Sequence, residues 1–224
     1  MQKQEENGLT NISDLKHVVY INLEHRTDRK IHVEQQLESI GIKSPLRFNA
    51  IKLPNGAIGC SMSHLKCLLM AKERGWPHVL ICEDDVDFLN PSLFLNQINK
   101  FLSIKTNDWD VVLIAGNNMH PYEHCSNSFI KIHHCLTTTG YIVQSHYYDT
   151  LINNYRDGIQ KLIKEPENKK EYAIDKYWIK LQEKNDWYLI IPLSVVQRPD
   201  YSDVEHTNSD FKNYMLNYNK CYTK

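Results

Sequence analysis

The sequence lacks several features that would place it in common classes of protein. Its 26 Lys and Arg residues balance 27 Asp and Glu residues, so the net charge of −1 leaves no overall positive field to hold a nucleic acid. No apolar run approaches the roughly 20 residues of a membrane span, and residues 1–16 are polar without the apolar core of a signal peptide. We therefore expect a cytoplasmic protein without nucleic-acid partners and without an integral membrane segment.

The cysteines also lack the close-paired spacing of a zinc ribbon or a redox pair. The group Cys125, His133, His134 and Cys135 invites a zinc interpretation, but its spacing does not match a closed tetrahedral site. We therefore predict that most of the six cysteines are buried free thiols.

What is present is enough apolar material for one core: 42% of the 224 residues are hydrophobic. We predict a single domain over residues 1–224, with a core at about 17–207 between a polar tail at 1–16 and a second tail at 208–224. Apolar runs and helical periodicities alternate through the chain, which predicts an α/β fold with a mostly parallel central sheet flanked by helices. The predicted strands are 16–23, 78–82, 110–115, 137–143 and 187–191. The predicted helices are 27–40, 59–74, 91–101, 148–155 and 174–181.

Ligands of open α/β sheets bind outside the carboxyl ends of the strands, so functional side chains are expected where strands stop. Residues 22–29 follow the first predicted strand and place Arg26 and Arg29 beside a helix N-terminus, a combination that favours phosphate. The alternative is a solvated turn with surface arginines.

The acidic run Glu83-Asp84-Asp85-Val86-Asp87 directly follows an apolar strand. Four carboxylates in five residues repel one another unless a cation or protons neutralise them. On an extended chain Glu83, Asp85 and Asp87 would share one side, which is an arrangement of hard oxygen ligands suited to Mn²⁺ or Mg²⁺. The alternative is an acidic helix N-terminus.

Residues 197–206 form a third polar stretch, after the last apolar region. Asp203 or His206 could return a ligand to the same metal, with Glu205 as another candidate, although Asp and Ser are also common in ordinary turns.

Three segments in this order resemble the family 25 glycosyltransferases, which include lipooligosaccharide galactosyltransferases and collagen hydroxylysine glycosyltransferases. These segments are Tyr20 to Arg29, Gly59-Cys60-Ser61-Met62-Ser63-His64-Leu65 and Glu83-Asp84-Asp85-Val86. The last resembles the family's Glu-Asp-Asp motif, the counterpart of the DxD element of GT-A folds. The segment Ser202 to Glu205 is similar to an element of the collagen-modifying members, whereas the Asn and Lys richness suits a bacterial enzyme or one of a virus-infected host cytoplasm.

The resemblance implies a GT-A nucleotide-sugar fold, a UDP-sugar donor, Mn²⁺ (or Mg²⁺) and inversion at the anomeric carbon. It places Asn22, Arg26 and Arg29 near the nucleotide, and Ser63 and His64 near the donor. It also places Glu83 and Asp85 at the ribose and the metal, with Asp84 as a further residue that binds the donor. The implied donor is UDP-glucose or UDP-galactose, and the implied acceptor is a glycan or a protein-linked hydroxyl.

Direct displacement requires a base for the acceptor proton. Asp175 is the candidate, because it starts a predicted helix behind residues 156–171, a charged segment expected to be a mobile loop; the alternative is a simple helix N-terminal acid. Two other functions use the same residues: a metal-dependent phosphohydrolase or nucleotidyltransferase, and a non-catalytic UDP-sugar-binding module.

Overall fold

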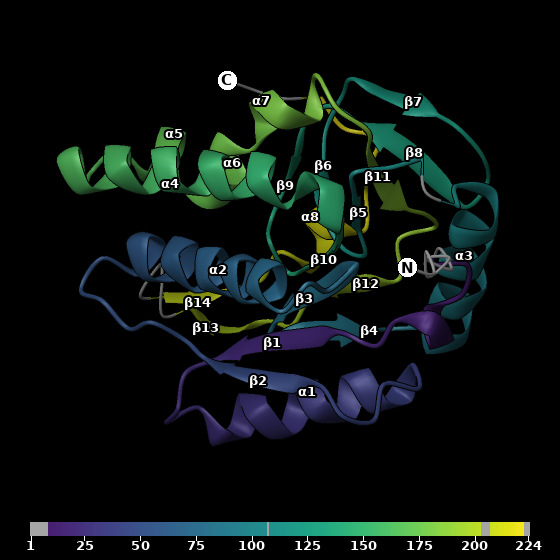
Figure 1. The fold of residues 1–224 in the computed structure, drawn as a ribbon, viewed down its shortest axis with the longest axis horizontal. Helices are drawn as coiled ribbons and strands as arrows, with labels where there is room; N and C mark the ends of the chain where they lie inside the picture. The colour runs from purple at the N-terminus through teal and green to yellow at the C-terminus, as the bar shows by residue number, and fades with distance from the viewer. Residues whose placement is uncertain (1–8, 107, 203–206, 222–224) are drawn as a thin grey trace, which may run out of the picture.

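A computed structural model describes residues 9–106, 108–202 and 207–221 of the protein. Figure 1 shows a twisted central sheet with helices packed on both of its faces. Its strand order is β2-β1-β3-β10-β5-β11-β8-β7. The bounds of these strands, in chain order, are β1 (Val18–Asn22), β2 (Leu46–Asn49), β3 (His78–Glu83), β5 (Val111–Leu113), β7 (Tyr122–His124), β8 (Phe129–Ile132), β10 (Gly140–Gln144) and β11 (Trp187–Ile190).

Short strands outside the main sheet pair as β4 with β12, β6 with β9, and β13 with β14. Their bounds are β4 (Val86–Phe88), β6 (Asn117–Asn118), β9 (Cys135–Leu136), β12 (Val195–Gln197), β13 (Asp200–Ser202) and β14 (Thr207–Ser209). The helices are η1 (Ile12–Asp14), α1 (Thr27–Ser39), α2 (Gly56–Glu73), α3 (Pro91–Ile104), η2 (Ser145–Tyr147), α4 (Tyr148–Lys164), α5 (Lys169–Tyr172), α6 (Ile174–Tyr177), α7 (Ile179–Gln182) and α8 (Lys212–Met215).

The α/β prediction is confirmed, but the sheet is mixed and not mostly parallel. Strands β2, β1 and β3 run parallel, as do β5 and β11, whereas β10 is antiparallel to both of its neighbours, β3 and β5. The apolar runs correctly indicated strands buried on both faces, but burial does not set direction. The direction of a strand depends on the end of the sheet at which the preceding connection enters. The chain reaches β10 only after it has passed through β6, β7, β8 and β9.

The core consists of two apolar layers, one on each face of the sheet. Along β1, Val18 and Tyr20 face the layer that contains α1 and α3, while Val19 and Ile21 face the layer that contains α2 and α4. This alternation follows from the two-residue period of a strand. It leaves the strand ends as the place where polar side chains can gather.

Local capping accounts for the helix boundaries on either side of the site. Asn55 accepts a hydrogen bond from the backbone nitrogen of Ile58 at the start of α2, and the predicted cap Asn90 accepts one from Leu93 at the start of α3. Gly41 and Gly75 end their helices at φ values of 86° and 63°, as predicted for C′ glycines. Thr27 is not the N-cap that the sequence suggested, because α1 begins at Thr27 and Arg26 occupies the N-cap position.

Two boundaries drawn from the sequence were wrong. Leu9, Ile12 and Leu15 are buried against the core, as is Met215 of α8, so the core extends beyond residues 17–207 on both sides. Residues 156–171 are not a long loop: α4 continues to Lys164 and α5 follows after a short turn. The charged residues that suggested a loop are the solvent face of α4, whose other face buries Ile159 and Leu162. Among the described residues, none of the helices has the length and apolar character needed to cross a bilayer.

Candidate functional site

The polar cluster lies at the carboxyl ends of the adjacent parallel strands β1 and β3. Asn22 ends β1, Glu83 ends β3, and Ile21 pairs with Glu83 in the register. A cavity of about 300 Å³ opens beside them. The residues that line it are Ile21, Leu23, Arg29, Ala50, Ile51, Lys52, Leu53, Gly56, Cys60, Ser63, His64, Glu83, Asp84, Asp85 and Gln197.

The acidic run is bent and not extended. Asp84 and Asp85 form a turn after β3, and Val86 begins β4, which pairs with β12 in a separate sheet. The turn buries Asp84 and Asp85 beside the cavity. Asp87 lies on β4, pairs with Val196 of β12, and is not among the described residues that line this cavity. The chain is therefore not extended through the acidic run, as the expected alternation requires.

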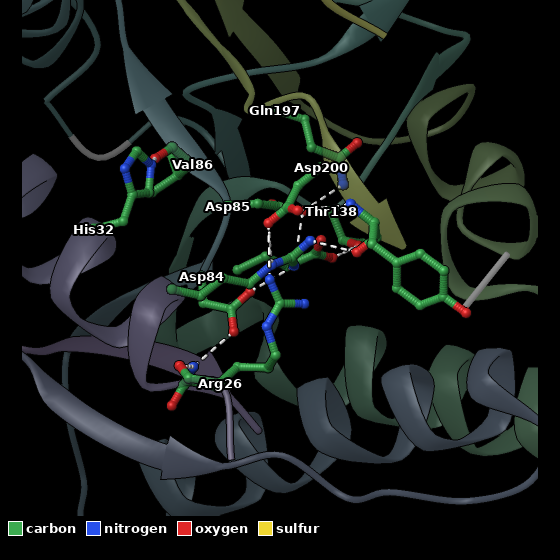
Figure 2. Close-up of polar contacts among 12 residues, drawn as sticks. Arg26, His32, Asp84, Asp85, Val86, Thr138, Gln197 and Asp200 are labelled. Carbon is green, nitrogen blue, oxygen red and sulfur yellow. Dashed lines mark hydrogen bonds and ion pairs between the residues drawn. The ribbon is translucent and has the colours of Figure 1, made fainter. Parts of the chain in front are cut away.

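Asp85 combines burial with an unsatisfied oxygen. Its Oδ2 accepts a hydrogen bond from Gln197 Nε2 at 2.8 Å (Figure 2) and lies 3.4 Å from Arg29 Nη1. Its Oδ1 is buried and has no hydrogen-bond partner within the described part of the chain. Burial, together with the negative charges of Glu83 and Asp84, raises the pKa of Asp85 to about 7, although Arg29 acts in the opposite direction. A buried carboxylate oxygen without a partner could bind a cation.

Both predicted arginines reach the site, but they hold protein groups there. Arg29 donates to Asp84 Oδ1 at 2.9 Å, to Asp200 Oδ2 at 3.1 Å and to the Tyr201 carbonyl at 2.8 Å. Arg26 donates to the same Asp200 oxygen at 2.8 Å. The arginines therefore fasten β13 to the acidic turn, and Figure 2 shows Asp200 and Asp84 in this network. The predicted metal ligands Asp203 and His206, between β13 and β14, lie outside the described residues.

Asn22 fixes Asp84 from the other side. Its Nδ2 donates to Asp84 Oδ2 at 2.8 Å and to the Arg26 carbonyl at 3.0 Å, and its Oδ1 accepts from Arg47 Nε at 2.9 Å. These contacts hold the acidic turn against the end of β1.

Helix α2 places the Gly59 to His64 segment against the cavity wall. A Cβ on Gly59 would lie 2.4 Å from the Ile51 carbonyl oxygen, so only glycine permits this approach. Ser63 Oγ accepts from the Ile51 backbone nitrogen at 2.9 Å and donates to the Gly59 carbonyl at 2.8 Å. These contacts fix residues 50–53, which line the cavity.

His64 links the helix to the acidic strand. It is buried, with Nδ1 2.8 Å from the Tyr141 hydroxyl and Nε2 3.3 Å from Glu83 Oε1. The same Glu83 oxygen accepts a hydrogen bond from Thr138 Oγ1. Burial opposes ionisation of Glu83, but the hydrogen bonds with His64 and Thr138 hold its pKa below the ordinary value.

A second cavity, of about 410 Å³, meets the first at Cys60, Glu83 and Gln197. Asp175 lines it at the start of α6 and accepts a hydrogen bond from the Thr137 backbone nitrogen at 3.2 Å. Burial raises the pKa of Asp175. The other residues that line the second cavity are Ala57, Asn117, Leu136, Thr137, Thr138, Lys169, Lys170, Ala173, Ile174, Lys176 and Phe211.

Sequence reasoning assigned no role to several residues of the site. Gln197 and Cys60 lay inside segments already singled out. Residues 50–53 follow β2, a strand that was not predicted from the sequence, so the strand-end rule was not applied there. Thr138 and Tyr141 gave no such signal, because β10 reaches the site only through its antiparallel insertion.

Comparison with protein families gives a match over more than half of the chain. The family described as glycosyltransferase family 25 (LPS biosynthesis protein) matches residues 47–178, a range that includes the Gly59 to His64 segment, the acidic turn and Asp175. The chain belongs to glycosyltransferase family 25. It is a glycosyltransferase with an α/β fold, in which helices flank a mixed central sheet.

Comparison of this glycosyltransferase with curated protein sequences gave no match. Among solved structures it resembles a glycosyltransferase involved in glycosylation of the major capsid of PBCV-1, with 12% identity, a TM-score of 0.44, and coverage of 78% of this chain and 92% of that one. It also resembles a Drosophila β1,4-galactosyltransferase 7 solved with manganese, UDP-Gal and xylobiose, with 15% identity, a TM-score of 0.34, and coverage of 61% and 52%. These likenesses are distant, and the family assignment rests on the sequence match.

Proposed function

We propose that this family 25 enzyme is inverting and metal-dependent, and that it moves glucose or galactose from a UDP-sugar to an acceptor hydroxyl. The observation that carries the proposal is the position of the acidic turn. Asp85, with its unsatisfied buried oxygen, faces the first cavity, and Glu83 lies where the first cavity meets the second. Such an arrangement suits a donor in one cavity and an acceptor in the other.

The charges around the first cavity support a divalent cation. Glu83, Asp84 and Asp85 contribute three carboxylates against the positive charges of Arg29 and Lys52, which leaves one negative charge when all are ionised. A diphosphate would add more negative charge, and its binding there without a cation would be strongly opposed. Mn²⁺ or Mg²⁺ fits the oxygen donors, with Asp85 as the main ligand. When bound, it would supply Lewis-acid stabilisation of the UDP leaving group.

The protein groups have separate roles in the proposed reaction. Asn22 and Arg29 hold the acidic turn in place, and Gly59 and Ser63 hold residues 50–53 as one wall of the donor cavity. Glu83 is held by His64 and Thr138, so its carboxylate has a fixed orientation between donor and acceptor. This preorganisation keeps both substrates in a reactive geometry.

Asp175 is the proposed general base. Its raised pKa makes it a better proton acceptor than an ordinary aspartate, and it lines the cavity proposed for the acceptor. The acceptor oxygen forms the bond to the anomeric carbon as its proton passes to Asp175 and the bond to UDP breaks. A single displacement of this kind inverts the anomeric configuration.

The acceptor cavity favours a glycan over hydroxylysine. Three lysines, Lys169, Lys170 and Lys176, line it against two carboxylates, and the excess of one positive charge suits an acidic or phosphorylated sugar better than the ammonium group of a lysine side chain. The family's association with LPS biosynthesis supports the same choice.

The test is to incubate the purified chain with Mn²⁺ and a panel of UDP-sugars, with and without glycan and hydroxylysine acceptors, and to measure released UDP. Acceptor-stimulated UDP release from UDP-glucose or UDP-galactose is expected. Release of phosphate or pyrophosphate would indicate a phosphohydrolase or nucleotidyltransferase, and UDP-sugar binding without turnover would indicate a binding module. Exclusive use of another donor would contradict the proposed sugar.

A further inference from the structure

Beside the oxygen-rich turn lies a second group of metal-binding atoms with different chemistry. Cys60 Sγ, His64 Nε2 or Nδ1, and a Glu83 carboxylate oxygen offer ligand atoms that all lie within 4.8 Å of one another. Cys60 and His64 are four residues apart on α2 and therefore share one face of the helix. Glu83 meets them from the end of β3.

Two of these side chains are already held in place by hydrogen bonds. The Tyr141 hydroxyl lies 2.8 Å from His64 Nδ1, and Tyr155 donates to Tyr141 at 3.1 Å. In the metal-free protein Nε2–H of His64 donates to Glu83, 3.3 Å away. When a metal binds, this proton can move to Nδ1 and donate to Tyr141, and the Nε2 lone pair then faces the ion. Thr138 orients the Glu83 carboxylate in turn. A ligating histidine whose second nitrogen is hydrogen-bonded is the usual supporting arrangement of zinc sites.

We propose that Cys60, His64 and Glu83 bind Zn²⁺, at a site separate from the Mn²⁺ or Mg²⁺ site proposed at Asp85, and that Zn²⁺ bound there inhibits the enzyme. Thiolate and imidazole prefer Zn²⁺ and Cd²⁺, whereas an all-oxygen set suits Mn²⁺ and Mg²⁺. Three protein ligands leave a fourth position for water. On binding, the Cys60 S–H bond breaks, its proton passes to solvent, and the sulfur–metal bond forms without any redox change.

The position of the cluster explains why its occupation would inhibit. Cys60 and Glu83 line both cavities, so an ion held between them lies at the junction of the proposed donor and acceptor sites. The inhibition rests on the proposed function, but the metal binding does not.

Burial and the charges of Glu83 and Asp175 raise the pKa of the Cys60 thiol well above its ordinary value. The free thiol is therefore not a reactive thiolate, and the same carboxylates attract a cation. Its thiol chemistry should become visible only when a soft metal ion displaces the proton.

The experiment uses the whole chain without nucleotide. Cd²⁺ is added while the ultraviolet thiolate-to-metal charge-transfer band is recorded, and Zn²⁺ affinity is measured by competition with a chromogenic chelator. One equivalent of metal with a thiolate band is expected. Cys60→Ser should abolish the band and weaken Zn²⁺ binding by more than about 100-fold, since loss of a mere supporting partner already costs roughly 10- to 100-fold.

Matched controls are the exposed cysteines Cys125 and Cys221. Cys125→Ser and Cys221→Ser should keep both the band and the affinity. Loss of the band in Cys125→Ser with retention in Cys60→Ser would overturn the proposal. It would place the metal at Cys125, whose Sγ contacts the Glu123 carbonyl, while the Glu123 side chain contacts His133. Tyr141→Phe should weaken Zn²⁺ binding about 10- to 100-fold while leaving the thiolate band at saturating metal.

The inhibition is tested by adding Zn²⁺ to an assay of UDP release. Inhibition that excess Mn²⁺ does not relieve, and that Cys60→Ser removes, is the expected result. Inhibition relieved by Mn²⁺ and unchanged in Cys60→Ser would locate Zn²⁺ at Asp85 and overturn the proposal. If no UDP is released under any condition but Zn²⁺ still binds through Cys60, the proposed function fails and the metal site stands.

Discussion

Replacing Asp85 with asparagine should stabilise the metal-free protein and at the same time remove metal binding. Asp85 is buried with one unsatisfied oxygen, and its pKa rises from an ordinary value of 3.8 to about 7. A folded pKa above the unfolded one means that the folded state binds more protons. The carboxylate therefore costs stability as the pH rises from about 4 towards 7, and the cost is complete above 7.

This pKa difference sets the expected magnitude. It corresponds to an upper bound of about 4 kcal/mol at pH 8 and about 2 kcal/mol at pH 5. Asparagine has the same shape and can still accept the hydrogen bond from Gln197. Asp85→Asn should therefore raise the free energy of unfolding in chelator, and the increase should be larger at pH 8 than at pH 5.

The stabilisation of the protein by bound metal should be lost in the same variant. A metal at 100 times its dissociation constant stabilises the wild type by about 2.7 kcal/mol, and this gain should disappear in Asp85→Asn. Urea unfolding at pH 5 and pH 8, with chelator or with Mn²⁺, measures both effects. Asp87→Asn is the matched control, because Asp87 lies outside the described lining of both cavities. The reasoning is refuted if Asp85→Asn is destabilised in chelator, if it keeps the Mn²⁺ gain, or if Asp87→Asn behaves identically.

Three further changes test other parts of the site and the fold. Asp175→Asn should lower kcat by about 10²- to 10⁴-fold in steady-state kinetics, while calorimetry should show unchanged affinity for metal and UDP. Joint loss of both affinities would place Asp175 in the donor site. Gly59→Ala should raise the KM for the donor and destabilise the fold by up to about 2 kcal/mol in urea unfolding. The reason is that the clash with the Ile51 carbonyl outweighs the better helix propensity of alanine. An unchanged KM would mean that residues 50–53 do not contact the donor. Burial and the charge of His17 lower the pKa of His78 to about 4, so stability should fall as the pH drops below about 6.5. Between pH 7 and pH 5 this loss is about 2 kcal/mol, and His78→Gln should reduce it by that amount; an equal loss in the variant would assign the acid sensitivity elsewhere.

Features determined by local patterns were predicted well from the sequence. The apolar runs before Asn22 and Glu83 indicated buried strands, and the helical spacing of α1, α2 and α3 was correct except at the ends. The strand-end rule also identified the two neighbouring loops that meet at the cavity, because the carboxyl ends of adjacent parallel strands share one edge of the sheet. The family motifs agreed with this independently.

Features that depend on distant partners were not determined by the sequence alone. The direction of β10 is set by the path of the preceding chain, and that direction brings Thr138 and Tyr141 to Glu83 and His64. The acidic run looked extended, but it turns at Asp84 and Asp85 before β4 pairs with β12, and Asp87 is not among the described residues that line either cavity.

The roles of the arginines likewise required the tertiary structure. The sequence predicts that Arg26 and Arg29 bind phosphate, and the structure adds that both contact Asp200, about 170 residues away. The sequence determined which chemical groups the site contains, since residue identity and local periodicity are written along the chain. Only the tertiary structure decided which of those groups bind one another and which face the cavities, because that depends on contacts between segments far apart in sequence.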